Sequence, residues 1–196
     1  MGRVVSLCGN IGSGKSTLVS NLNQKQNVYQ VVQEPISEMN DLLIKYYKDI
    51  SKWAFHLQCK VLLLYNKMKN MFSTERNYIV ERSPIESKYI FAQALYDSGN
   101  LTKIEFQLYE ELYDSLGWSP DFIIYIRTEP QTCLERIKQR SRDCECDISL
   151  EYIKQLDTLY ENFFEKYMHS KNIFVIDGNK DTDEVYNACK QLLNIL

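Results

Sequence analysis

A glycine-rich run near the start of the chain has the residue types and spacing of a phosphate-binding loop. Residues 9–16 read G-N-I-G-S-G-K-S, which matches the pattern G-x-x-x-x-G-K-[ST] in full. Glycines let the backbone approach phosphate oxygens closely, and the amides at the start of the following helix attract an anion. We expect the following residues to bind a nucleoside triphosphate: Gly9, Asn10, Ile11, Gly12, Ser13, Gly14, Lys15, Ser16 and Thr17.

Three side chains of this loop have separate expected tasks. Lys15 should contact the β- and γ-phosphate oxygens, Ser16 should ligate Mg²⁺, and Thr17 should help to hold the phosphates. A strand-like apolar run precedes the loop and an amphipathic segment follows it, which argues against a chance match in a turn. The motif predicts triphosphate binding, but it does not choose between transfer to an acceptor and hydrolysis.

Acidic residues follow two further apolar runs. Glu34 precedes Pro35, which disfavours helix at Glu34 and keeps it at the end of a strand. Glu81 and Arg82 follow residues 78–80 in the same way. Such carboxylates are often only solvated. Two acids and an arginine at the same edge as a phosphate loop, however, are what transfer of a γ-phosphoryl group to an acceptor hydroxyl requires.

A basic run begins at residue 136. Arg136 and Arg140 are four residues apart and share one helix face, while Lys138 and Arg142 belong to the same run. Such runs are usually a solvated surface, but this one is followed by a polar segment poor in helix formers. A basic helix end followed by a loop is typical of a lid that closes over phosphates, here about residues 136–148.

These residues must be positioned by alternating strands and helices. Apolar strands alternating with helices indicate an α/β fold with a parallel sheet covered on both faces, in which ligands bind at the carboxyl ends of the strands. The sequence predicts strands at residues 4–7, 28–33, 78–80, 122–126 and 173–176, and helices at 18–23, 41–47, 51–72, 84–96, 102–116, 130–137, 150–167 and 181–193.

Composition narrows the class of protein further. The 196 residues are 44% hydrophobic and carry a net charge of −3, which argues against a nucleic-acid or membrane-surface binder. The apolar runs are too short to span a membrane. The six cysteines have no disulfide-framework spacing, and the first residues lack the apolar run of a secretion signal, so we expect reduced thiols. We therefore expect one domain over residues 1–196, in the cytoplasm.

A switch GTPase is the main rival that uses the same loop. Residues 178–182 read G-N-K-D-T, but the aspartate comes one place too early for the guanine-binding pattern N-K-x-D. Residues 114–117 match D-x-x-G by letter, but they lie at a helix end before the fourth strand. Both segments are better interpreted as turns, so a kinase is the preferred interpretation.

Taken together, the motifs resemble the deoxynucleoside kinase family over nearly the whole chain. The shared motifs are the phosphate loop, Glu34-Pro35, residues 53–58, Glu81-Arg82-Ser83, residues 89–92 and the R-x-x-x-R-x-R run at 136–142. The resemblance implies a three-layer P-loop kinase fold with a five-stranded parallel sheet and an arginine-rich lid. It also implies ATP as the phosphate donor, Mg²⁺, and a deoxynucleoside as the acceptor.

The resemblance implies roles for the charged residues. Glu34 would be the general base on the 5′-hydroxyl, Arg82 would stabilise the developing charge, and Glu81 would help to hold Mg²⁺. The phosphates would be clamped by Arg136, Arg140 and Arg142. The loop after the last strand would lie against the adenine of ATP through Asn179, Lys180 and Asp181.

The resemblance also implies how the nucleoside is held. Tyr47 and Glu145 would bind the sugar 3′-hydroxyl, Gln58 would pair with the base edge, and Phe91 would stack on the base. The pocket would be lined by Ile11, Ile36 and Leu43. The residue types by themselves favour other roles. Aromatic residues on amphipathic helices more often belong to the core, and a glutamine on a long helix more often lies on the surface.

Three departures from the family affect which nucleobase the protein is expected to accept. Met39 replaces a tryptophan that is common after Glu-Pro and softens one pocket wall. Tyr65 and Ser87 stand where members that read cytosine or purines carry an arginine and an aspartate. Losing that pair argues against purines, and Tyr65 would fill the space that a purine needs. We therefore expect a pyrimidine deoxynucleoside, thymidine first and deoxycytidine second.

The remaining expectations concern partners and the nearest alternative enzyme. The family commonly dimerises through two helices, for which residues 51–72 and 102–116 are the candidates here. A nucleoside monophosphate kinase of the thymidylate kinase type shares the loop, an acid-arginine motif and a lid. Its acceptor phosphate would need cations after the second strand, whereas residues 34–38 are acidic.

Overall fold

The computed structural model describes residues 2–25, 28–140, 145, 148–167 and 172–196. Within these residues, the five strands form one parallel sheet, as the sequence predicts, and the structure gives their order as β2-β3-β1-β4-β5. Its strands are β1 (Val4–Cys8), β2 (Tyr29–Val32), β3 (Asn77–Glu81), β4 (Phe122–Arg127) and β5 (Ile173–Asp177). Because β1 is central, the loop that follows it lies between the ends of β3 and β4.

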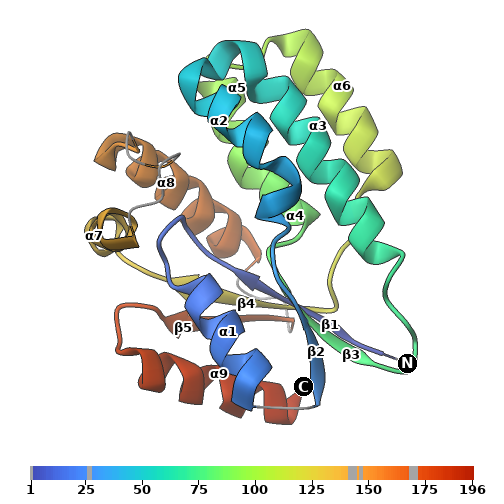
Figure 1. Cartoon of the computed structure of the whole chain (residues 1–196), viewed down its shortest axis with the longest axis vertical. Helices are drawn as coiled ribbons and strands as arrows, with labels where there is room; N and C mark the ends of the chain where they lie inside the picture. The colour runs from blue at the N-terminus through green and yellow to red at the C-terminus, as the bar shows by residue number, and fades with distance from the viewer. Residues whose placement is uncertain (1, 26–27, 141–144, 146–147, 168–171) are drawn as a thin grey trace.

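The two sheet faces carry separate apolar cores. Val5 and Leu7 of β1 point into a core with α1 (Lys15–Lys25) and α9 (Thr182–Ile195). Cys8 and Tyr125 point to the opposite face, against α8 (Leu150–Tyr167). Figure 1 shows α1 and α9 on one side of the sheet and the other large helices on the opposite side. This double coverage explains why the strands are apolar throughout.

A helical bundle extends the second face. It contains α2 (Asn40–Lys48), α3 (Ile50–Lys69) and α6 (Lys103–Leu116), which share a core around Leu62 and Tyr109. The short helix η1 (Ile36–Met39) connects β2 to this bundle. The helix α6 begins with the capping box that Thr102 and Glu105 predict. Figure 1 shows α3 and α6 running side by side.

The segment after β3 differs from the single helix predicted for 84–96. It consists of α4 (Pro84–Glu86), a π-helical segment η2 (Ser87–Ala92) and α5 (Gln93–Asp97). Wider π turns inside helices are frequent at functional sites. Periodicity alone does not distinguish such a turn from an α-helix, because one inserted residue leaves the apolar pattern almost unchanged.

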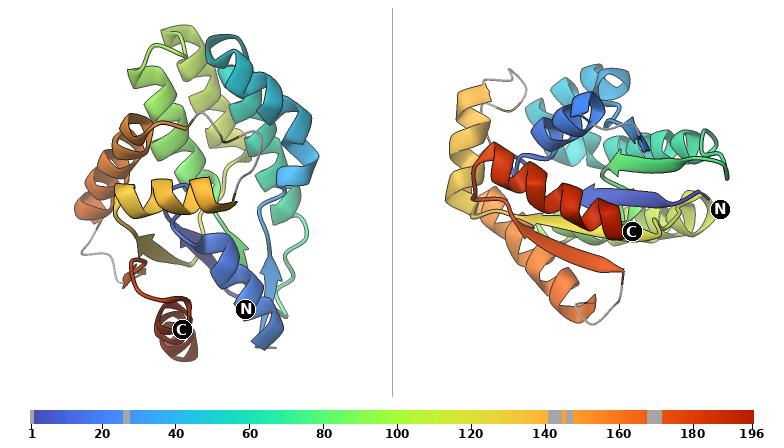
Figure 2. Two further views of the ribbon diagram at one scale, coloured as in Figure 1. Left: turned by 60° about the vertical axis from the view of Figure 1, so that its left-hand side comes forward. Right: turned by 90° about the horizontal axis from the view of Figure 1, so that it is seen from below.

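The remaining parts of the fold are the helix that leads into the predicted lid and the end of α3. The helix α7 (Pro130–Arg140) lies beside the start of α1, as Figure 2 shows. The helix α3 ends three residues before the predicted Phe72, whose ring packs against Tyr78 and Trp118 instead. Within the described part of the chain, no helix is both long and apolar enough to cross a membrane.

Candidate active site

The phosphate loop connects β1 to α1 with a backbone that requires glycine. Gly12 has φ +80°, and a Cβ on it would lie 2.3 Å from the carbonyl oxygen of Cys133 in α7. Gly14 has φ +99°. Side chains rarely adopt these conformations, so the two glycines allow the loop to wrap tightly beneath α7. The predicted loop therefore has the curvature that a phosphate cradle needs.

Lys15 is buried within this loop. Its Nζ donates to the carbonyl oxygens of Gly9 at 2.8 Å and Asn10 at 2.7 Å, and to the hydroxyl of Ser13. Burial and then the charge of the nearby Arg82 together lower the pKa of Lys15 to about 8, although the acidic residues around it oppose this shift. A bound triphosphate would supply the negative charge that this ammonium lacks.

This pKa leads to a test of nucleotide binding. Phosphate oxygens favour the ammonium, so binding must raise the pKa of Lys15 above 8. At pH values above 8, ATP binding should take up protons, and affinity should fall as pH rises. Titration calorimetry in buffers of different ionisation enthalpy, at about pH 7 and about pH 9, measures this uptake. Lys15→Arg stays charged and should lose the uptake. Equal uptake in both proteins would contradict the assignment.

The predicted metal ligands meet at the end of β3. Ser16 Oγ donates a 2.6 Å hydrogen bond to Glu81 Oε1, although the two residues are 65 apart in the chain. A hydroxyl and a carboxylate oxygen are the hard ligands that Mg²⁺ prefers. These residues therefore fit the ion, which would neutralise charge on the triphosphate.

Glu34 and Arg82 form a largely buried ion pair. The Nε of Arg82 donates to Glu34 Oε2 at 3.2 Å, and their side chains are 8% and 16% exposed. Burial raises the pKa of Glu34, and Arg82 partly opposes this shift. A carboxylate with a raised pKa is a better proton acceptor, which suits a general base.

The backbone of Arg82 is strained. Its φ of +65° places a non-glycine residue in the left-handed region. Its guanidinium lies 4.8 Å from the centre of the Phe91 ring. Strain of this kind persists only where surrounding contacts hold it, and it gathers at functional sites. Here it turns the Arg82 side chain toward the phosphate loop, where Nη1 donates to the Gly9 carbonyl oxygen at 3.1 Å.

A cavity of about 140 Å³ lies between this ion pair and the helical bundle. All the side chains predicted to bind the nucleoside line it: Ile11, Glu34, Ile36, Leu43, Tyr47, Gln58, Tyr65, Arg82, Ser87, Phe91 and Glu145. The lining also contains Met39, and Tyr46 and Tyr152, which the sequence did not single out. Apolar and aromatic side chains thus form much of the wall, and charged and polar side chains, among them Glu34, Arg82 and Gln58, form the rest.

Gln58 is held inside this cavity rather than on the surface. It is 4% exposed, and its Oε1 accepts a 3.1 Å hydrogen bond from Ser87 Oγ. Ser87 Oγ is also 2.7 Å from the hydroxyl of Tyr109. The amide of Gln58 therefore has a supported orientation from which it could read the edge of a base.

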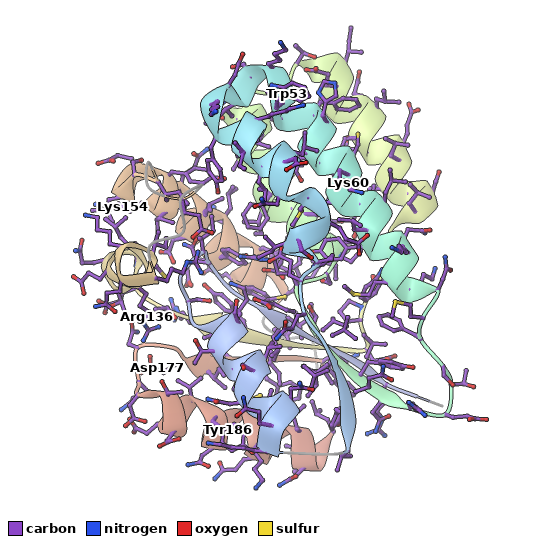
Figure 3. All side chains as sticks on the ribbon, viewed as in Figure 1. Trp53, Lys60, Arg136, Lys154, Asp177 and Tyr186 are labelled. Carbon is purple, nitrogen blue, oxygen red and sulfur yellow. The ribbon has the colours of Figure 1, made fainter. Side chains whose placement is uncertain are left out.

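A second cavity, of about 390 Å³, surrounds the phosphate loop. Residues 12–17, Arg136, Arg140 and Lys180 line it. Arg136 Nη1 donates to the carbonyl oxygens of Ser13 and Gly178, so it connects α7 with the loop after β5 (Figure 3). Asn179 and Asp181 are not among the described lining residues. Asn179 instead accepts from the Glu129 amide, and Asp181 caps α9.

Arg140 and Glu145 were assigned to different ligands but are paired with each other. The Nε of Arg140 donates to Glu145 Oε2 at 2.8 Å, and Nη2 contacts the same oxygen. Both side chains line the nucleoside cavity, and Arg140 also lines the phosphate cavity. The third predicted lid arginine, Arg142, lies outside the described residues.

Two buried residues of the site were missed by sequence reasoning. Glu86 lies beneath the phosphate loop and bonds Arg82, and the hydroxyl of Tyr160 joins both. The segment from Ser83 to Glu86 matches a helix capping box by letter, although Ser83 makes no side-chain cap. Tyr160 lies on an amphipathic helix, where aromatic residues are usually core. Only its hydroxyl distinguishes it.

The fold and the site define a P-loop phosphotransferase. The family model for deoxynucleoside kinases matches residues 5–195, and the chain belongs to that family. A fowlpox virus protein named "probable deoxycytidine kinase" is 34% identical over 95% of this chain and 83% of its own length. Human mitochondrial thymidine kinase 2 is 32% identical over 96% of this chain and 75% of its own length.

The solved structures agree with this family. A deoxyadenosine kinase from M. mycoides, with dCMP and dCDP bound, superposes with a TM-score of 0.87 at 30% identity. The match covers 97% of this chain and 98% of the other. The protein is therefore a kinase of the deoxynucleoside kinase fold, and a nucleotide-binding switch protein is not favoured.

Proposed function

We propose that the protein transfers the γ-phosphoryl group of ATP to the 5′-hydroxyl of a pyrimidine deoxynucleoside, thymidine first and deoxycytidine second. The products are the 5′-monophosphate and ADP. The observation that carries the proposal is the Glu34–Arg82 pair at 3.2 Å, which lies between the phosphate loop and the cavity that Gln58 and Phe91 line. A base, a cation and a phosphate cradle thus meet at one end of the cavity.

The proposed reaction assigns one task to each group. Glu34 takes the proton of the 5′-hydroxyl while the 5′-oxygen of the nucleoside bonds to the γ-phosphorus of ATP. At the same time, the bond between the γ-phosphorus and the oxygen that bridges it to the β-phosphate breaks. Negative charge passes to ADP, where Lys15 and the loop amides stabilise it. Ser16 and Glu81 would hold Mg²⁺, which would supply further charge neutralisation. We assign Arg136, Arg140 and Arg142 to the phosphates, and Tyr47 and Glu145 to the sugar.

The proposed preference for a pyrimidine rests on the side chains around Tyr65. Tyr65 is 2% exposed and lines the cavity together with Gln58 and Phe91. We expect its ring to limit the room for the second ring of a purine. Ser87 is already bonded to Gln58 and brings no charge to the base. Gln58 can therefore pair with a pyrimidine edge while Phe91 stacks on it.

A substrate panel tests this proposal. ATP consumption with Mg²⁺ is measured against thymidine, deoxycytidine, deoxyadenosine, deoxyguanosine and thymidine monophosphate. We expect the highest kcat/KM with thymidine, followed by deoxycytidine. A preference for purines would overturn the role given to Tyr65. Turnover of thymidine monophosphate alone would place the protein with the monophosphate kinases and remove the role of Glu34.

Introducing the arginine and aspartate that other family members carry at positions 65 and 87 should change the base preference. We expect Tyr65→Arg with Ser87→Asp to shift the ratio of kcat/KM values toward deoxycytidine or purines. The reason is that a fixed charge pair can satisfy an amino-bearing base edge. Tyr65→Phe with Ser87→Ala changes the same positions without charge and should keep the pyrimidine order. An unchanged order in the charged variant would remove these residues as selectors.

We also propose a homodimer through α3 and α6. Leu63 of α3 is 55% exposed, and Ile104 and Leu108 of α6 are 78% and 45% exposed. Exposed apolar side chains on adjacent helices are a common feature of protein interfaces. Light scattering should give twice the chain mass, and Ile104→Asp with Leu108→Asp should give the monomer. A monomeric mass for the unaltered protein would refute this interface.

A further inference from the structure

Glu86 is a buried carboxylate beneath the phosphate loop. Its side chain is 2% exposed, and it is absent from the described lining of the nucleoside cavity. Its Oε1 lies 2.8 Å from Arg82 Nη1, 3.2 Å from the Gly9 amide nitrogen and 2.5 Å from the Tyr160 hydroxyl. One oxygen therefore joins three segments of the site: the loop after β1, the end of β3, and α8.

This burial has a cost in stability, because a carboxylate loses its hydration when it is buried. The other carboxylate oxygen, Oε2, is buried and has no hydrogen-bond partner among the described residues. The neighbouring thiol of Cys8 has a pKa raised by burial and by Glu86. Apolar side chains in place of a buried ion pair are often at least as stable. Stability alone therefore does not explain an acid at this position.

Glu86 instead determines how the hydrogen bonds of the Arg82 guanidinium are divided among its partners. Within the described residues, Arg82 donates through Nε to Glu34 and through Nη1 to Glu86, Gly9 and Tyr160. Because the guanidinium is planar and rigid, two carboxylates on different nitrogens fix its plane. Without Glu86, the guanidinium could turn to meet Glu34 with two nitrogens. That bidentate pair would make Glu34 a weaker base.

We propose that Glu86 is a positioning residue for phosphoryl transfer, which holds Arg82 against the phosphate loop and prevents it from pairing fully with Glu34. This inference rests on the proposed role of Glu34 as the base. The charged groups that act on Glu34 are Arg82 and Lys15, which lower its pKa, and Glu81 and Glu86, which raise it. Removing the charge of Glu86 should therefore lower the pKa of Glu34.

Glu86→Gln tests the proposal in the complete chain. We expect kcat to fall by roughly 10- to 100-fold, because the reacting groups are misplaced. The binding constant for thymidine should stay unchanged, because Glu86 does not line the cavity. The acid limb of the kcat/KM profile should move to lower pH. A purely structural role would lower stability without moving that limb. An unchanged kcat with an unmoved limb would overturn the proposal.

Two further variants complete the test. Glu86→Asp keeps the charge but shortens the reach to Arg82, so kcat should fall, and the acid limb should move less than in Glu86→Gln because the nearby negative charge remains. If Glu86→Gln does not fold, full activity in Glu86→Asp would still refute the proposal. Glu161→Gln is the matched control, because it removes a carboxylate from the exposed Arg127 pair on the same helix as Tyr160. It should keep wild-type kcat and pH profile.

The base assignment is tested separately. Loss of activity in Glu34→Gln together with normal kinetics in Glu86→Gln would remove only the role of Glu86. Near-normal activity in Glu34→Gln would remove the proposed base, whatever Glu86→Gln does. The failure of the inference and the failure of the proposed function are therefore distinguishable.

Discussion

Glu34→Gln is expected to lower kcat by roughly 10²–10⁴-fold while ATP still binds, because only the proton acceptor is lost. The amide has nearly the same shape as the carboxylate and can still accept the hydrogen bond from Arg82 Nε, which is 3.2 Å long in the structure. The phosphate loop follows β1, whereas Glu34 follows β2, so the loop should keep its conformation. Steady-state kinetics with thymidine gives kcat, and calorimetry gives the ATP binding constant.

The pH dependence gives a second sign of the same role. Protonated Glu34 cannot accept the hydroxyl proton, so kcat/KM should fall as pH drops through its pKa. Burial raises the pKa of Glu34, and the acid limb should therefore lie at a higher pH than an exposed glutamate would give. In Glu34→Gln this limb should disappear.

A second glutamate distinguishes loss of the general base from the effect of removing any negative charge nearby. Glu38 is four residues further on, with a side chain 45% exposed, and it pairs with Lys67 at 3.0 Å on the surface. Glu38→Gln should leave kcat close to that of the unaltered protein. Equal losses in the two variants would contradict the assignment of Glu34, as would near-normal turnover in Glu34→Gln.

Arg82→Leu is the second change with a large expected effect. It leaves Glu86 as a buried carboxylate without its cation, and removes the partner of Glu34. Breaking a buried pair on one side costs about 3–5 kcal/mol in the free energy of unfolding. Loss of the donor near the reacting groups should also lower kcat by roughly 10²–10³-fold. Urea denaturation and steady-state kinetics measure the two effects.

The stability effect can be assigned to the buried charge by a second substitution. Adding Glu86→Gln to Arg82→Leu removes the unpaired carboxylate, so part of the lost unfolding free energy should return. Arg127→Leu is the control for loss of an arginine from an ion pair. Its side chain is 62% exposed beside Glu161, so the change should cost about 1 kcal/mol or less. Similar losses in Arg82→Leu and Arg127→Leu would contradict this explanation.

Most of the fold follows from local sequence patterns. Apolar runs such as residues 122–126 identify strands buried on both faces, and the structure places all five predicted strands in one parallel sheet. The helix predicted from residue 102 is α6, which begins with a capping box formed by Thr102 and Glu105. The π turn in the helix after Pro84 was not predicted, because its apolar spacing resembles that of an ordinary helix.

The candidate site was predictable where its residues follow strands. Parallel strands end at one edge, so a phosphate loop after one strand and acids after two others must lie close together. The lining of the nucleoside cavity needed the family resemblance in addition. Periodicity by itself does not distinguish a pocket residue such as Gln58 from an exposed residue on the same helix. Burial, not spacing, identifies it.

The sequence alone therefore determined the sheet, the phosphate loop, and the strand ends that carry Glu34 and Arg82. Only the tertiary structure decided how Arg82 is shared. Glu86 and Tyr160 reach the same guanidinium from positions 4 and 78 residues away, and the second contact leaves no local pattern. Such contacts depend on where helices pack against the sheet. That packing arises from summed apolar burial over the whole chain, which no single motif encodes.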